Sequence, residues 1–146
     1  MKERIETLYT AFQRKDGAAM AACYHPEATF SDPVFEGLRG AEIGAMWTML
    51  CERGKDLRIE FSATEDTAHW EARYTFSTTG RLVHNVIDAR FAFRDGLIAE
   101  HVDTFDFWAW SKQALGATGW ALGWTPVLRR KVGATARRQL DKYMAR

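Results

Sequence analysis

Apolar residues in the first third of the chain recur three and four positions apart, the spacing that gathers them on one face of an amphipathic helix. This spacing predicts a first helix up to about Phe12 and a third helix that ends at Gly54. Between them, Asp16 is expected to cap a short second helix, and His25-Pro26 to stop it, because proline disfavours helical backbone at the preceding residue. The apolar residues that define the three helices are Ile5, Leu8, Tyr9 and Phe12; Met20, Cys23 and Tyr24; and Ile43, Met46, Trp47 and Leu50.

From Leu57 onward the period changes to two, and apolar residues alternate with polar ones as in half-buried strands. Asp95-Gly96 is a strong hairpin signal, because glycine tolerates the positive φ that such turns require. We therefore predict an α+β fold in which helices pack on one face of a curved antiparallel sheet. The four predicted strands cover about residues 57–63, 70–76, 82–94 and 97–105.

The tail has a different character. Asp106 is expected to cap a helix that holds Phe107, Trp108, Trp110 and Leu115, and a last helix is predicted after a glycine-rich stretch. Residues 127–146 contain seven lysines and arginines against one acidic residue, a net charge of +6. We interpret this run as a solvated helix face, with contact to an acidic partner or to lipid as the alternative. The predicted division is a domain over residues 1–106 and a helical extension over residues 107–146, packed on or beside it.

Composition excludes several classes of protein. Hydrophobic residues make up 47% and charged residues 27% of the 146, the balance of one globular domain. With 20 Lys+Arg against 19 Asp+Glu, the whole chain offers no case for a nucleic-acid partner. Two cysteines are too few for a disulfide framework. No apolar run reaches about 18 residues and no leader opens the chain, so we expect no membrane partner and a cytoplasmic location.

The predicted last strand carries two ionisable residues between apolar ones. Residues two apart on a strand share a face, so His101 and Asp103 are expected to project to the same side, about 7 Å apart at their backbones. Burying a carboxylate and an imidazole costs several kcal/mol unless they are paired or reach a wet cavity. We interpret the two as a catalytic pair in a pocket, because perturbed ionisable groups concentrate at functional sites. A buried hydrogen bond without function, or an exposed pair, is the alternative.

Other candidates lie on neighbouring segments. Asp32 precedes Pro33, a context that also fits an ordinary turn. On the predicted strand 82–94, Asn85 shares the apolar face, whereas alternation places Asp88 on the outer face in a cross-strand ion pair. A metal site of two histidines and one carboxylate, His84, His101 and Asp103, is conceivable, but no local spacing supports it and no metal is expected.

The chain resembles a known superfamily. A helix, a short helix, the segment Tyr24-His25-Pro26-Glu27-Ala28-Thr29-Phe30-Ser31-Asp32-Pro33, a glycine loop, a third helix and four antiparallel strands look like the nuclear-transport-factor-two-like superfamily. Within it, the SnoaL-like polyketide cyclases and ketosteroid isomerase are the most similar branch. The resemblance covers about residues 1–106. It implies a cone-shaped, strongly curved antiparallel sheet with the three helices on its concave face, around a small-molecule pocket.

The resemblance also implies roles for single residues. Asp32 is similar to the general-base aspartate of ketosteroid isomerase, and Asp88 to the aspartate that binds its oxyanion. The second role conflicts with alternation unless the strand has a bulge. Asp103 resembles the last-strand aspartate of limonene epoxide hydrolase and the acid of SnoaL-like cyclases, and His101 beside it fits the SnoaL-like pattern.

We therefore expect a homodimeric protein that binds a small, largely apolar molecule without a cofactor. If it is an enzyme, it would isomerise or cyclise its substrate by removing a proton next to a carbonyl, with Asp103 or Asp32 as base and His101 as orienting group or proton shuttle. A binding module without catalysis, water activation of the epoxide-hydrolase kind and a dimeric interaction protein are the alternatives. The residues expected to contact the ligand are Tyr74, Trp70, Asn85, Trp47, Phe30, Tyr9 and Asp88.

Overall fold

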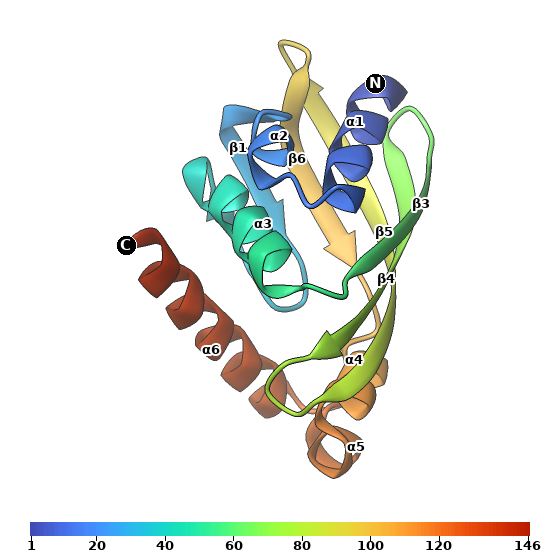
Figure 1. The fold of residues 1–146 in the computed structure, drawn as a ribbon, viewed down its shortest axis with the longest axis vertical. Helices are drawn as coiled ribbons and strands as arrows, with labels where there is room; N and C mark the ends of the chain where they lie inside the picture. The colour runs from blue at the N-terminus through green and yellow to red at the C-terminus, as the bar shows by residue number, and fades with distance from the viewer.

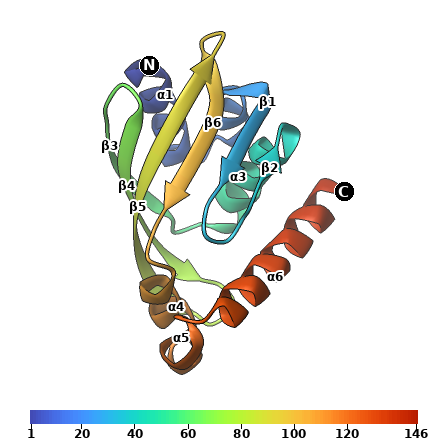
Figure 2. The same cartoon turned by 180° about the vertical axis from the view of Figure 1, so that it is seen from behind.

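A six-stranded sheet with helices along its inner face forms the body of the computed structural model, which describes all 146 residues (Figure 1). The strand order is β2-β1-β6-β5-β4-β3, and the sheet is curved without closing into a barrel (Figure 2). The fold is therefore α+β, as the sequence predicted. The elements are α1 (Lys2–Gln13), α2 (Gly17–Ala21), β1 (Tyr24–Ser31), β2 (Leu38–Arg39), α3 (Ala41–Arg53), β3 (Arg58–Ala63), β4 (Thr67–Phe76), β5 (Arg81–Arg94), β6 (Leu97–Thr104), α4 (Phe107–Leu115), α5 (Ala117–Leu122) and α6 (Pro126–Met144).

The local signals for caps and turns are confirmed. The Asp16 carboxylate accepts a hydrogen bond from the Ala19 amide at the start of α2, and Asp106 does the same for Ala109 in α4, both at 3.0 Å. At the β5–β6 hairpin, Asp95 and Gly96 both have positive φ, 56° and 77°. Such values define the hairpin turn that an Asp-Gly pair favours.

Two strands add to the four that were predicted. β1 pairs in parallel with β6, and the short β2 pairs antiparallel with β1. The register of β1 shifts between Tyr24 and Thr29, the stretch that contains Pro26. Because proline has no amide hydrogen to donate, it interrupts the ladder and obscures the strand in the sequence. Tyr24 consequently begins this strand instead of ending the second helix.

One inward residue on β6 departs from the expected alternation. Phe93 pairs with Ile98 while Ala92 pairs with Glu100, so Ala99 is an extra residue in a β-bulge. The bulge turns Ile98 inward, where it is fully buried. Strict alternation from the inward His101 would place Ile98 on the outer face, and the extra residue is the reason that it faces inward.

The C-terminal helices line the open end of the sheet and also join the main core. α4 packs on β5 and α6 on α3, where the Arg137 guanidinium forms an ion pair with Glu42. Leu140 of α6 is fully buried in the main core. A second apolar cluster joins the strands to α4 and α6 and contains Val83, Phe107, Trp110, Ala114 and Leu128. No helix is both long and apolar enough to span a bilayer.

The burial of Leu140 leads to a test of the part that α6 plays in folding. Leu140→Ala is expected to lower the free energy of unfolding by about 2–4 kcal/mol, because it removes buried methyl groups and leaves a cavity. Val127→Ala on the same helix is the control, since that side chain is 70% exposed and its loss should cost less than about 0.5 kcal/mol. Urea denaturation measures both. Equal stability of the two variants would contradict the packing of α6 into the core.

Candidate functional site

A chain of hydrogen bonds runs through the core from α3 to β6. The indole of Trp47 donates to the Tyr24 hydroxyl at 3.0 Å, and that hydroxyl lies 2.8 Å from His101 Nδ1. On the other side of the ring, His101 Nε2 lies 2.7 Å from Asp103 Oδ1. The strand alternation on β6 thus places His101 and Asp103 side by side on the inner face, as predicted.

The number of protons on each group determines which atoms donate and which accept in this chain of hydrogen bonds. Tyr24 has one hydroxyl proton and already accepts from Trp47, so the arrangement that satisfies every group has Tyr24 donating to His101 Nδ1. Nε2 then carries the imidazole proton and donates to the Asp103 carboxylate. This gives a neutral histidine held between a phenol and a negatively charged carboxylate.

Aromatic rings enclose the pair. His101 is 0% and Asp103 3% exposed, and the ring centroids of Phe91 and Phe30 lie 4.3 and 4.9 Å from that of His101. The ring of Trp47 stacks on that of His101, with 6.1 Å between the ring centroids. The Trp70 indole donates a long hydrogen bond of 3.4 Å to Asp103 Oδ1. The space around His101 and Asp103, between the helices and the centre of the sheet, is therefore filled by side chains. Three of the predicted ligand contacts, Phe30, Trp47 and Trp70, pack around this pair.

Tyr9 of α1 is a further member of this core. Its ring packs against Phe61, Trp70 and Phe91, with centroids 5.3, 5.7 and 6.4 Å away. Its hydroxyl is the one fully buried side-chain polar atom that has no hydrogen-bond partner. Burial raises the pKa of Tyr9 well above its usual value, and the charge of Asp103 adds to the rise. Tyr9 therefore stays protonated beside Asp103, with a hydroxyl free to donate.

Asp32 lies next to Asp103 because β1 and β6 run in parallel. The register pairs Phe30 with His101 and Ser31 with Val102, and Asp32 is the first residue after β1. It comes close enough to Asp103 for the charge of Asp103 to raise its pKa. The Asp32 carboxylate accepts hydrogen bonds from the amides of Val34 and Phe35, at 2.7 and 2.6 Å. These bonds hold the carboxylate at the end of the strand.

Asp32 titrates near neutrality. Burial raises its pKa to about 7, and the negative charge of Asp103 adds to the rise, while the bonds from Phe35 and Val34 oppose it. Unlike Asp103, Asp32 is only half-buried. Its carboxyl is withdrawn from solvent, and only part of the residue reaches the protein surface.

Two polar residues on the inner sheet face, Tyr74 and Asn85, are half-buried. The Tyr74 hydroxyl accepts from the Trp110 indole at 2.8 Å, and burial, with a contribution from the charge of Asp32, raises the pKa of Tyr74. Asn85 shares this face, and its amide makes no hydrogen bond within the protein. Val34, Phe105 and Tyr74 each pack against both apolar clusters, so this zone lies between them. Polar groups converging among apolar walls are typical of a small-molecule site.

Two predicted contributors lie elsewhere. Asp88 is on the outer face of β5, 75% exposed at its side chain, and its carboxylate is 2.9 Å from His69 Nδ1. The alternation placed it correctly, and the oxyanion-binding role implied by the resemblance has no geometric basis, because β5 has no bulge near Asp88. His84 is also on the outer face, 2.6 Å from Glu71, so it does not join His101 and Asp103 around a metal.

The place of Tyr24 in the hydrogen-bonded core was not predicted from the sequence. This residue was assigned to a helix, although Tyr24, Ala28 and Phe30 all stand at even positions and all three are buried in β1. That period of two was the available signal, and Pro26 in its middle concealed it.

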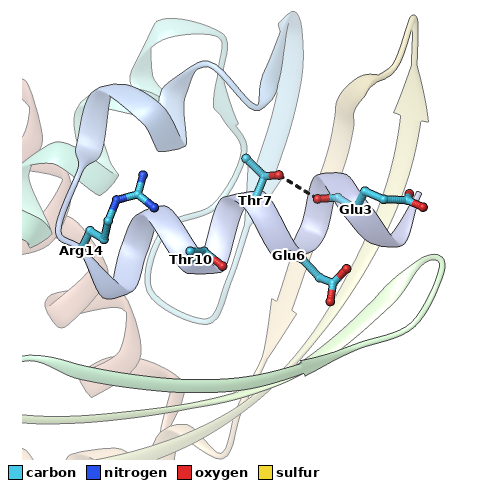
Figure 3. Close-up of a pocket in the computed structure, with 5 residues that line it drawn as sticks. All are labelled: Glu3, Glu6, Thr7, Thr10 and Arg14. Carbon is cyan, nitrogen blue, oxygen red and sulfur yellow. Dashed lines mark hydrogen bonds between the residues drawn. The ribbon is translucent and has the colours of Figure 1, made fainter.

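One surface hollow lies away from this zone, and a second borders it from outside. One, of about 380 Å³, is on the exposed side of α1 and is lined only by polar residues, Glu3, Glu6, Thr7, Thr10 and Arg14 (Figure 3). The other, of about 340 Å³, lies between α6 and the β1–β2 loop, with Val34, Phe35, Arg129, Arg130 and Arg137 among its lining residues. The first has no apolar wall for a ligand of the expected kind, and the second borders Val34 from outside.

A model of the SnoaL-like domain matches residues 5–101, more than half of the chain, and the chain belongs to the SnoaL-like family. No curated protein matches it. Solved structures of similar fold include a candidate polyketide cyclase from a Silicibacter species, with 20% identity, a TM-score of 0.65 and coverage of 77% of this chain and 93% of that one. A protein with a ketosteroid isomerase-like fold from Catenulispora acidiphila, in complex with trimethylamine, has 15% identity, a TM-score of 0.63 and coverage of 85% and 98%.

An LEH-like epoxide hydrolase from M. tuberculosis has 18% identity and a TM-score of 0.57, with coverage of 78% of this chain and 88% of that one. At these identities the likeness shows the fold alone. The shared scaffold carries cyclase, isomerase-like and hydrolase proteins, so the activity has to be argued from the side chains.

The raised pKa of Asp32 leads to a test by stability. The native state keeps this proton up to a pH of about 7 whereas the unfolded chain releases it near 3.9, so Asp32 makes the protein less stable as pH rises from 4 to 7. Asp32→Asn retains the acceptor for the Val34 and Phe35 amides but cannot ionise. Its stability relative to the native protein is expected to improve between pH 4 and pH 8 by on the order of 3 kcal/mol, measured by urea denaturation.

Asp106→Asn provides the control, because Asp106 is an exposed aspartate that also accepts a backbone amide. The stability of this variant relative to the native protein should change little over the same pH range. If the Asp32 variant behaves in the same way, the carboxyl of Asp32 is ordinarily ionised at neutral pH and the burial argument is wrong.

Proposed function

We propose that this SnoaL-like protein is an acid/base isomerase or cyclase that acts next to a carbonyl of a small, largely apolar molecule. The observation that carries the proposal is Asp32, a half-buried carboxyl with a pKa of about 7 beside the enclosed Asp103. A general base works best when its pKa lies near the working pH.

The proposed reaction uses Asp32 as the base. Its carboxylate takes a proton from the carbon next to the carbonyl, the C–H bond breaks, and the electron pair moves to the carbonyl oxygen as an enolate. The Tyr74 hydroxyl, which accepts from Trp110 and keeps its own proton, and the Asn85 amide are the donors proposed for that oxygen. Where a C=C bond is conjugated with the enolate, return of the proton from Asp32 to the far carbon of that bond gives the isomer. Attack of the enolate carbon on a second carbonyl carbon of the substrate gives a ring, and Asp32 returns its proton to the alkoxide that forms.

Asp103 and His101 support this base in the proposal. The buried charge of Asp103 helps to keep the pKa of Asp32 high, and His101 with Tyr24 and Trp47 holds Asp103 in place. This reverses the emphasis of the sequence-based expectation that named Asp103 first, because Asp103 is almost fully enclosed. The homodimer, the cytoplasmic location and the boundary at residue 106 stay predictions.

Proton exchange provides the assay. In D₂O, the protein is expected to catalyse deuterium incorporation next to the carbonyl of 2-tetralone and related small cyclic ketones, followed by NMR. The rate should rise with pH through about 7 as Asp32 becomes ionised. Asp32→Asn is expected to lower the rate by roughly 10²–10⁴, the usual contribution of a positioned general base.

Asp88→Asn is the matched control, since Asp88 is the aspartate that lies on the outer face. It should retain the native rate, and Asp103→Asn should lower the rate and shift the inflection of the pH profile. A native rate in Asp32→Asn would exclude Asp32 as the base. Loss of exchange in Asp88→Asn would contradict the assignment of the inner face as the site.

A binding module without catalysis is the second candidate, and the full enclosure of His101 favours it. Such a protein would bind the ketones, detected by calorimetry, without promoting exchange. Asp32→Asn would then alter the pH dependence of binding and leave the exchange rate at the level of the buffer.

A further inference from the structure

The far end of the C-terminal helices displays large apolar side chains to solvent. Trp120, Trp124 and Val127 are 62%, 67% and 70% exposed. With the less exposed Leu122 and Trp108 they form what we call the tryptophan tip, which consists of Trp108, Trp120, Leu122, Trp124 and Val127. In both views of the fold, α5 stands at one end of the molecule, beyond the sheet, and α6 starts near that end (Figures 1 and 2).

Specific contacts hold the residues of the tryptophan tip in place. The Trp108 indole donates to the Trp120 carbonyl at 3.3 Å, and the two rings meet edge to face at 6.2 Å. The Trp124 indole donates to the Ala121 carbonyl at 3.0 Å. α5 sits so close to α4 that a Cβ on Gly119 would come within 1.9 Å of the Ser111 carbonyl oxygen. These contacts hold the indoles outward, although burying them would remove apolar surface from water.

Basic groups accompany the tip. The Lys112 ammonium lies 4.4 Å from the Trp108 ring and 4.6 Å from that of Trp120. On α6, Lys131 and Arg138 follow Val127 at helical spacing, so all three share an exposed face. The acidic residue of this helix, Asp141, is engaged by Arg137 at 3.2 Å. The apolar tip therefore continues into an outer helix face of uncompensated positive charge.

We propose that the tryptophan tip and the basic outer face of α6 dock on the surface of an anionic lipid bilayer. Indole rings suit the boundary between headgroups and acyl chains, because they have an apolar body and one polar N–H. Lysines and arginines beside such rings are attracted to anionic headgroups. The protein would lie on the membrane and not cross it. The inference does not depend on the proposed enzymatic function.

Two other occupants fit less well. A protein partner would need a hollow shaped to a projecting tip, whereas a bilayer surface yields to it. A second copy of the chain would bring two basic α6 faces together, with repulsion between like charges. The proposal departs from the sequence-based expectation of no membrane partner, because the sequence did not show that these tryptophans are exposed.

Co-sedimentation with vesicles tests the proposal on the full chain. We expect binding to vesicles of equal parts phosphatidylcholine and phosphatidylglycerol at low salt, and much weaker binding to phosphatidylcholine alone or at high salt. Trp124→Ser with Val127→Ser is expected to weaken binding roughly tenfold or more. Lys131→Glu with Arg138→Glu should weaken it by about fivefold or more for each residue.

Matched controls separate the surface from the net charge. Arg58→Glu with Arg90→Glu changes the net charge by the same amount at exposed sites on the sheet. Val86→Thr replaces an exposed apolar side chain on the sheet by a polar one. Both controls should bind as the native chain does. Failure of the native chain to bind, equal loss in the two charge-reversal variants, or conversion of an oligomer to a monomer by the tip variant would overturn the proposal.

Discussion

The burial of one carboxylate and one imidazole at successive inward positions of β6 constrains how β1 and α3 pack against the centre of the sheet. His101 and Asp103 can lie among phenyl and indole rings only because each polar atom of the histidine has a partner. Removing one member of a buried pair typically costs about 3–5 kcal/mol, since the other is left uncompensated. The partners Tyr24 and Trp47 come from β1 and α3, so this chain of hydrogen bonds fixes one strand and one helix against the centre of the sheet. The aromatic packing and the hydrogen bonds are thus two parts of one constraint.

Alternation and local turn chemistry were sufficient for the parts of the fold formed by neighbours in sequence. They located the inner faces of β4 and β5, the caps at Asp16 and Asp106, and the outward direction of Asp88. They failed where one residue breaks the period, at Pro26 in β1 and at the bulge that turns Ile98 inward. A pattern of period two has no means of registering an extra residue until the partner strand is known.

The candidate site was harder to predict, because it depends on contacts between distant segments. Asp32 and Asp103 are 71 positions apart, and only the parallel pairing of β1 with β6 places them side by side. The resemblance to a family supplied Asp32 as a candidate, but it also supplied Asp88, which lies on the other face. Where a resemblance and the strand alternation disagreed, the alternation was correct, because the direction of a side chain on a regular strand is a geometric necessity.

The C-terminal helices form part of the surroundings of Tyr74. The family match ends at residue 101, yet the Trp110 indole of α4 donates to the Tyr74 hydroxyl, and α4 and α6 provide four of the five buried residues of the second apolar cluster. Tyr74 packs against both clusters and is only half-buried, and it is close enough to Asp32 for the charge of Asp32 to raise its pKa. Packing at the end of β1 removes the carboxyl of Asp32 from bulk water and thereby raises its pKa. The nearly complete enclosure of Asp103 on β6 makes that residue a fixed neighbour of Asp32.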